Sequence, residues 1–146
     1  MLKLERIFKK LNENKIRYLT VGGLASVLYG APRSTADIDI TIMPERSNVK
    51  KTIITLKELG LSPETEDVTE ILGVGGTSFE NDWKIDMLVD MKPKDFDYAW
   101  KNKTVIKFKG VELYVIPKKI HISILKKLGR AQDIEDIKYL EGKNVF

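Results

Sequence analysis

Hydrophobic and polar residues alternate along two segments of the chain, and this alternation predicts two β-strands. In residues 37–42, two aspartates alternate with isoleucines. In residues 83–90, every second residue is apolar, and this set is Trp83, Ile85, Met87 and Val89. Because successive side chains of a strand point to opposite faces, Asp37 and Asp39 share one face of the first strand. The polar face of the second strand likewise carries Lys84, Asp86, Leu88 and Asp90.

Other segments place apolar residues at helical spacing or between turn residues. The predicted helices are residues 2–14, 47–59 and a pair within 117–142, with Ser47 as a cap and Gly129 between the last two. The remaining predictions are a strand from Tyr18, a Gly-Gly turn with a short helix, a hairpin at 103–117 and a short strand at 77–80 in an otherwise irregular segment, 61–82. The chain therefore alternates strands and helices, as expected of an α/β protein.

Composition narrows the chemistry that this chain can perform. Its 146 residues are expected to form a single domain, 1–146, that buries a core without disulfides. The chain has no Cys and one His, which excludes thiol chemistry and disfavours a histidine metal cluster, so carboxylates are the available catalytic groups. No apolar run is long enough to span a membrane and no secretory signal opens the chain, so we expect a cytoplasmic protein. The single histidine, His121, is assigned no role.

The most informative segment is YLTVGGLASVLYGAPRSTADIDITI, residues 18–42. Two carboxylates on one face of a strand repel each other unless a cation lies between them, and Mg²⁺ prefers such oxygen ligands. The Gly22-Gly23 pair opens the short helix, where backbone N–H groups could receive phosphates. The alternative is an edge strand with solvated carboxylates. Asp95 and Asp97 repeat the Asp-x-Asp spacing without this context.

This segment resembles the signature of the nucleotidyltransferase superfamily, which has the polymerase-beta-like fold. It is most similar to the minimal branch that contains AbiEii-type toxins and small aminoglycoside or lincosamide nucleotidyltransferases. The Arg33-Ser34-Thr35 sequence before the aspartates matches the family's Arg-x-Thr pattern. Many members have Ser directly after the first glycine, whereas this chain has Gly23, so backbone N–H groups would have to bind the triphosphate.

The resemblance implies a fold as well as an activity. We expect an α/β (α+β) protein with a mixed, twisted sheet and helices mainly on one face. The nucleotidyltransferase core would occupy about residues 15–90, and a C-terminal hairpin and helical pair would occupy residues 103–142. The implied reaction moves a nucleoside monophosphate from a nucleoside triphosphate (NTP) to an acceptor hydroxyl or phosphate.

The resemblance also implies roles for individual residues. Asp37 and Asp39 would bridge two Mg²⁺ ions, with Mn²⁺ as a substitute, and Asp86 is preferred over Asp90 as the third carboxylate. The nucleotide-binding residues would be Gly22, Gly23, Arg33, Thr35, Lys126 and Arg130. Arg33 would either stabilise the leaving pyrophosphate or pin its loop to the strand. Lys126, Arg130, Asp133 and Asp136 also fit ordinary solvated ion pairs along a helix.

The acceptor is left open by the sequence, with tRNA, protein and a small molecule as the candidates. Residues 91–130 carry eleven basic and three acidic residues, which favours a polyanion such as RNA but also fits solvated strand and helix faces. A toxin with an antitoxin partner, and a homodimer, are further expectations of the family resemblance. The rival interpretation is a non-catalytic module that binds nucleotide or RNA.

Overall fold

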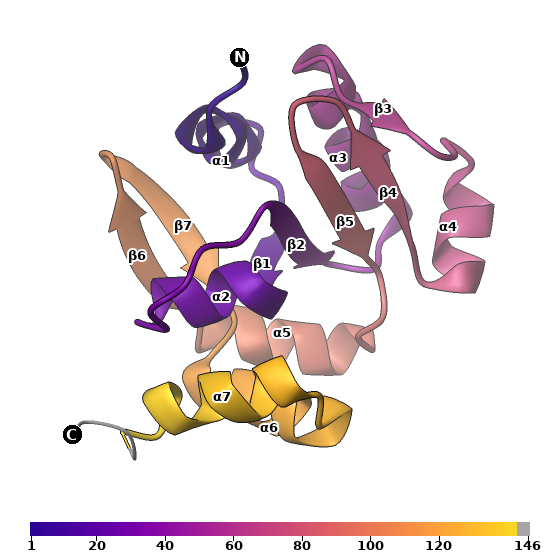
Figure 1. The fold of residues 1–146 in the computed structure, drawn as a ribbon. Helices are drawn as coiled ribbons and strands as arrows, with labels where there is room; N and C mark the ends of the chain where they lie inside the picture. The colour runs from indigo at the N-terminus through magenta and orange to yellow at the C-terminus, as the bar shows by residue number, and fades with distance from the viewer. Residues whose placement is uncertain (143–146) are drawn as a thin grey trace.

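The computed structural model describes residues 1–142, which form a seven-stranded mixed sheet with helices packed against it (Figure 1). The strands are β1 (Tyr18–Val21), β2 (Asp37–Ile42), β3 (Ser62–Pro63), β4 (Gly76–Glu80), β5 (Lys84–Leu88), β6 (Thr104–Phe108) and β7 (Val111–Val115). The helices are α1 (Leu4–Glu13), α2 (Gly22–Leu28), α3 (Arg46–Glu58), α4 (Val68–Val74), α5 (Pro93–Lys101), α6 (Lys118–Leu128) and α7 (Ala131–Leu140).

The strand order across the sheet is β3-β4-β5-β2-β1-β7-β6. Strand β2 pairs parallel to β5 and antiparallel to β1, and β1 pairs parallel to β7. The pairs β3–β4, β4–β5 and β6–β7 are antiparallel. Strands β6 and β7 form the predicted hairpin, with Gly110 in its turn. The α/β class, the mixed sheet and the C-terminal helical pair are therefore confirmed.

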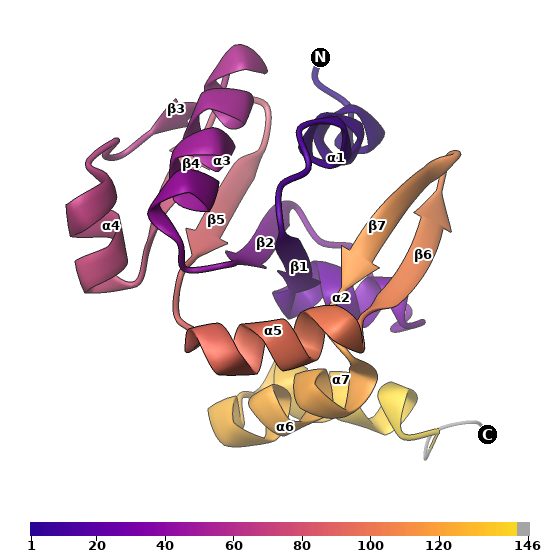
Figure 2. The same ribbon diagram turned by 180° about the vertical axis from the view of Figure 1, so that it is seen from behind.

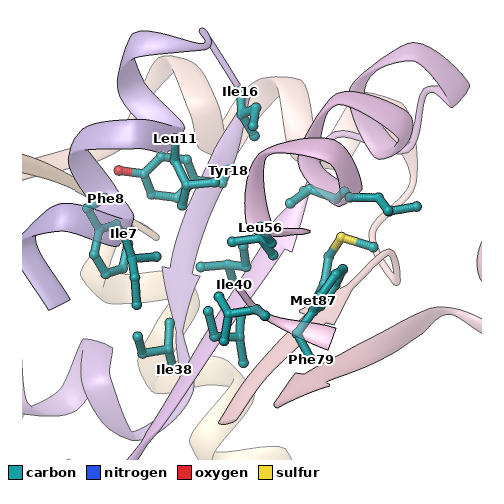
Figure 3. Close-up of a cluster of buried hydrophobic side chains, with 14 of the residues drawn as sticks. Ile7, Phe8, Leu11, Ile16, Tyr18, Ile38, Ile40, Leu56, Phe79 and Met87 are labelled. Carbon is teal, nitrogen blue, oxygen red and sulfur yellow. The ribbon is translucent and has the colours of Figure 1, made fainter. Parts of the chain in front are cut away.

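The larger hydrophobic core lies on the face of the sheet that carries the isoleucines of β2. Ile38 and Ile40 pack there among the buried side chains of α1, α3, β4 and β5, as Figure 3 shows. The members labelled from those elements are Ile7, Phe8, Leu11, Leu56, Phe79 and Met87. Burial of these apolar side chains is the main force that holds the central strands in place.

A second core cluster lies around β1, where Leu19 and Val21 pack with Ala25 of α2 and with Phe96 and Ala99 of α5. Helices α6 and α7 lie side by side next to α5, at the bottom of both views (Figures 1 and 2). This arrangement brings the last two helices close to α2, whose first two residues are Gly22 and Gly23.

Two local predictions differ from the structure. Helix α3 begins at Arg46 with Glu45 as its N-cap, so Ser47 lies inside the helix and does not cap it. The segment predicted as mostly irregular contains helix α4, which Asp67 caps by accepting a hydrogen bond from the backbone N–H of Glu70 at 3.1 Å. Gly75 ends α4 in the left-handed conformation that glycine adopts without strain. No helix in residues 1–142 has the length and apolarity that crossing a membrane requires.

Candidate functional site

Two of the three predicted carboxylates lie side by side because of the register between β2 and β5. Asp39 pairs directly with Asp86 across these parallel strands, and Asp37 pairs with Lys84. Asp39 and Asp86 are half-buried, while Asp37 is exposed at the start of β2. Asp90, the alternative to Asp86, lies beyond the end of β5 and accepts a hydrogen bond from the Thr41 hydroxyl at 3.1 Å.

The pairing perturbs the acidity of Asp39. Burial raises its pKa to about 6, and the hydrogen bond and the negative charge of Asp86, together with the charge of Asp37, act in the same direction. The positive charge of Lys84 opposes them. A carboxyl group with such a pKa marks a place where negative charge is concentrated and only partly compensated.

Ser78 is a site residue that the sequence did not indicate. It lies opposite Asp86 in the antiparallel pair β4–β5, and its hydroxyl donates a hydrogen bond to Asp86 Oδ1 at 2.5 Å. This contact fixes one oxygen of Asp86, while the other is left for Asp39 or a ligand. Only the strand register could have identified Ser78, because its sequence context is an unremarkable Thr-Ser-Phe.

The Gly22 backbone passes directly beside Asp39. Gly22 has a φ of +63°, and a Cβ atom placed on it would collide with the carboxylate of Asp39. Residue 22 must therefore be glycine for two reasons: its backbone conformation is one that other residues rarely adopt, and there is no room for a side chain. The backbone after β1 thus lies in contact with the carboxylate of Asp39.

Arg33 and Thr35 lie against the second glycine of the turn. A Cβ atom on Gly23 would lie 3.2 Å from Arg33 Nη2 and 3.2 Å from Thr35 Oγ1. The Arg33 guanidinium also forms a forked ion pair with Asp136 of α7, with Nε–Oδ1 and Nη2–Oδ2 distances of 3.0 and 2.9 Å. Hydrogen bonding to Asp136 is the main reason that the pKa of Arg33 is raised.

Arg130 lies at the start of α7, where it is tied to Asp133. The Arg130 Nε and backbone N–H both donate to Asp133 Oδ2, at 2.7 and 3.1 Å, and Nη2 donates to Oδ1 at 3.1 Å. The pKa of Arg130 is raised chiefly by Asp133, and the charge of Asp39 contributes in the same direction. Asp133 therefore holds the Arg130 side chain, within electrostatic reach of Asp39.

Lys126 lies apart from this group. It is exposed on α6 and forms an ion pair with Glu141 at 3.3 Å, a pairing between the two C-terminal helices. The structure does not bring it into the group formed by Gly22, Gly23, Arg33 and Arg130.

His121 is buried beneath the same region, although the sequence assigned it no role. Its Nε2 lies 2.8 Å from the hydroxyl of Ser26, and its Nδ1 has no hydrogen-bond partner among the described residues. Burial lowers the pKa of His121 to about 4, against the charges of Asp136 and Asp133. The imidazole is therefore neutral near pH 7.

These elements enclose a cavity of about 230 Å³ between the Gly-Gly turn and the two C-terminal helices. One wall is polar or charged and the other is apolar. The lining residues are Gly22, Gly23, Arg33, His121, Ile124, Leu125, Leu128, Arg130, Gln132, Asp133 and Asp136. Such a combination suits a ligand that has both an anionic and an apolar part.

The carboxylates have the donor chemistry for a hard divalent cation. In the described part of the chain, no three acidic or histidine side chains are already arranged around one metal position. Asp39 and Asp86 nevertheless lie side by side, Asp37 adds negative charge to the pKa-raising surroundings of Asp39, and a cation bound there would relieve this repulsion. Oxygen ligands of this type fit Mg²⁺ or Mn²⁺.

No protein-family model matches the sequence, and no curated protein matches it. Solved structures do match across nearly the whole chain. A candidate nucleotidyltransferase from Thermotoga maritima shares 19% identity over 97% of this chain and 91% of its own, with a TM-score of 0.65. The lincosamide antibiotic adenylyltransferase LnuA, with lincomycin bound, shares 17% identity over 97% of both chains, with a TM-score of 0.68. ANT(2″)-Ia in complex with adenylyl-2″-tobramycin shares 16% identity over 94% of this chain and 84% of its own, with a TM-score of 0.67. The chain therefore has the fold of the nucleotidyltransferases.

Proposed function

We propose that this protein transfers a nucleoside monophosphate from an NTP to an acceptor hydroxyl. The observation that carries the proposal is the direct pairing of Asp39 with Asp86. This pair lies beside Gly22, a position that has room only for glycine. Phosphoryl-type transfer depends on charge neutralisation and in-line positioning more than on a covalent role for the protein. A cluster of carboxylates beside a cavity with two arginines suits that requirement.

Asp37, Asp39 and Asp86 would hold two Mg²⁺ ions. Bound there, the metal would neutralise phosphate charge and make the acceptor oxygen more nucleophilic. The raised pKa of Asp39 supports this assignment, because a group that resists ionisation next to other carboxylates gains most from a cation. Ser78 would keep Asp86 oriented toward Asp39 through the hydrogen bond to Oδ1.

The remaining residues would bind the nucleotide. The triphosphate would lie along Gly22 and Gly23, within reach of Arg33 and Arg130, and Thr35 would hold the loop that carries Arg33. Lys126 would contribute from the rim only after leaving its ion pair with Glu141. In the reaction, a bond forms between the acceptor oxygen and the α-phosphorus as the bond to the bridging oxygen of pyrophosphate breaks. The acceptor proton would pass to a site carboxylate.

A small molecule with a hydroxyl group is the acceptor class that the comparisons favour. Two of the similar structures hold an antibiotic or an adenylylated antibiotic. The match to LnuA covers 97% of this chain and 97% of the LnuA chain. An acceptor of that size needs no additional domain. RNA and protein acceptors are the competing possibilities that a screen with labelled NTP would separate.

The experiment is thermal unfolding of the wild type with each NTP, with and without Mg²⁺, followed by transfer from an α-phosphate-labelled NTP. Binding to the native state raises its apparent stability by mass action. We expect an Mg²⁺-dependent rise in melting temperature for the donor NTP, which Asp39→Ala abolishes together with transfer. Asp95→Ala is the matched control, because it removes the first aspartate of the second Asp-x-Asp sequence, in α5.

Two results would count against the proposal. Transfer by folded Asp39→Ala protein would eliminate the mechanism. NTP binding by the wild type without transfer to any acceptor would favour the non-catalytic binding module.

A further inference from the structure

Asp136 is a buried carboxylate to which the proposed function gives no role. Its side chain is only 3% exposed, on the inner face of α7. Burial acts to raise its pKa, but hydrogen bonds from Arg33, Ser26 and Gln132 outweigh burial and hold the pKa below the ordinary value. Asp136 is therefore a charged acceptor on which α2, the loop before β2 and α7 converge.

The Arg33 guanidinium is held by this carboxylate at one edge. Nε and Nη2 make the forked contact with Asp136, so two of the three nitrogens are committed to it. Nη1 makes only a long contact of 3.4 Å with the carbonyl oxygen of Ser34. Because the guanidinium is planar, fixing one edge also fixes the direction of Nη1.

The fixed guanidinium lies directly against the Gly-Gly turn. The position that a Cβ atom of Gly23 would take is 3.2 Å from Nη2 and 3.5 Å from Nη1. The space in which a side chain at residue 23 would lie is thus occupied by Arg33. Arg33 and Gly23 also line the same 230 Å³ cavity.

We propose that Asp136 is a positioning residue for the nucleotide, because its fork with Arg33 keeps Nη1 beside Gly23, where it can donate to a phosphate oxygen. This inference rests on the proposed function. It also explains how a chain with glycine at residue 23 supplies a side-chain donor to the turn. The donor comes from Arg33, and Asp136 determines where it lies.

The test compares Asp136→Asn with Glu135→Gln, a matched change at the neighbouring residue of α7. Glu135 is half-exposed, and its only ion pair within residues 1–142 is with Lys138, at 3.5 Å. Amide hydrogen exchange of residues 22–36 is measured without ligand, and affinity for Mg·ATP is measured by calorimetry. We expect Asp136→Asn to speed exchange in this segment and to weaken Mg·ATP binding about 10-fold or more, since a charge-assisted hydrogen bond is lost. Glu135→Gln should match the wild type in both measurements.

A second variant separates positioning from a purely structural latch. Arg33→Lys keeps the positive charge opposite Asp136, but a single ammonium group cannot form the fork and also present a directed donor at Gly23. We expect a melting temperature close to that of the wild type and a Mg·ATP affinity about 10-fold weaker. This variant also keeps the test decisive if Asp136→Asn fails to fold.

The possible results test this inference and the proposed function separately. If folded Arg33→Lys or Asp136→Asn binds Mg·ATP as tightly as the wild type, or if exchange in residues 22–36 is unchanged in Asp136→Asn, this inference is overturned and the proposed function stands. If the wild type itself binds no NTP, the proposed function fails first and this inference fails with it.

Discussion

Replacing Asp39 with asparagine should stabilise the metal-free protein while it removes the proposed activity. The carboxylate of Asp39 is half-buried next to Asp86, and these surroundings raise its pKa from 3.8 to about 6. A raised carboxyl pKa means that the ionised form is less favourable in the folded state than in the unfolded state. The uncharged amide of asparagine has a similar shape, can donate to Asp86 and carries no such penalty.

The size of the effect follows from the difference between the two pKa values. A difference of one pKa unit corresponds to 1.36 kcal/mol. The rise from 3.8 to about 6 therefore sets an upper limit of about 3 kcal/mol on the stability that Asp39→Asn gains above pH 6. Because Asp39 is only partly shielded from water, solvent screening reduces the expected gain to about 1–2 kcal/mol. An ionised aspartate at this position therefore costs stability, as expected if the proposed metal site needs its charge.

The sign of the pH dependence makes the test specific. The penalty is fully present above pH 6, declines as Asp39 takes up a proton, and is absent below pH 3.8. Urea unfolding at pH 8 and at pH 4.5, without metal, should therefore show a clear gain for Asp39→Asn at pH 8 that falls to about a third at pH 4.5. Asp37→Asn is the control, since Asp37 is exposed and its removal should give a smaller gain.

An equal gain at both pH values would refute the electrostatic explanation, and so would no gain at pH 8. Adding Mg²⁺ provides a second check, because the ion should stabilise the wild type and leave Asp39→Asn unchanged if the carboxylates bind it.

Three other perturbations have expected outcomes. Gly22→Ala should destabilise the protein by at least about 1–2 kcal/mol in urea unfolding, because an L-residue at φ +63° is strained and its Cβ collides with Asp39; normal stability would contradict the described turn. Burial lowers the pKa of His121 from 6.5 to about 4, so the folded protein resists protonation of this side chain. The free energy of unfolding should therefore decline by up to about 3 kcal/mol as the pH drops from 6.5 to 4. His121→Gln should show a shallower decline over that range, and identical pH profiles would show that other groups are responsible. Phe79→Ala, which empties a fully buried position, should lower the free energy of unfolding by about 3–5 kcal/mol, and a loss below 1 kcal/mol would mean that this part of the core collapses readily.

The elements that short-range patterns specify were predicted well from the sequence. Alternation in residues 37–42 and 83–90 placed the isoleucines and Met87 on one face and the carboxylates on the other, and burial in the structure follows that division. Helix α4 was missed because it is short and lies among turn-forming residues, although Asp67 before it and Gly75 after it are ordinary helix-capping signals.

The parts of the site that depend on long-range pairing have no local signal in the sequence, and only the family resemblance implied that Asp86 joins Asp37 and Asp39. The contact of Asp39 with Asp86 requires a parallel register that no local pattern encodes, and the contact of Ser78 with Asp86 requires a further antiparallel one. The fork between Arg33 and Asp136 joins residues far apart in the chain, and in the sequence Asp136 resembled any solvated helix acid. The position of Asp136 along its helix does not reveal that its side chain is buried against a residue from a distant part of the chain.

The register of β2 against its neighbours also protects the protein from a particular folding error. If β2 slipped by one residue, Asp37 and Asp39 would turn into the apolar layer and Ile38 and Ile40 would face the opposite side. Burying two uncompensated carboxylates is far more costly than leaving two isoleucines in water. A chain that pairs wrongly here is therefore driven back toward unfolding, so the molecules that survive as folded protein are those in which the carboxylates already face the site.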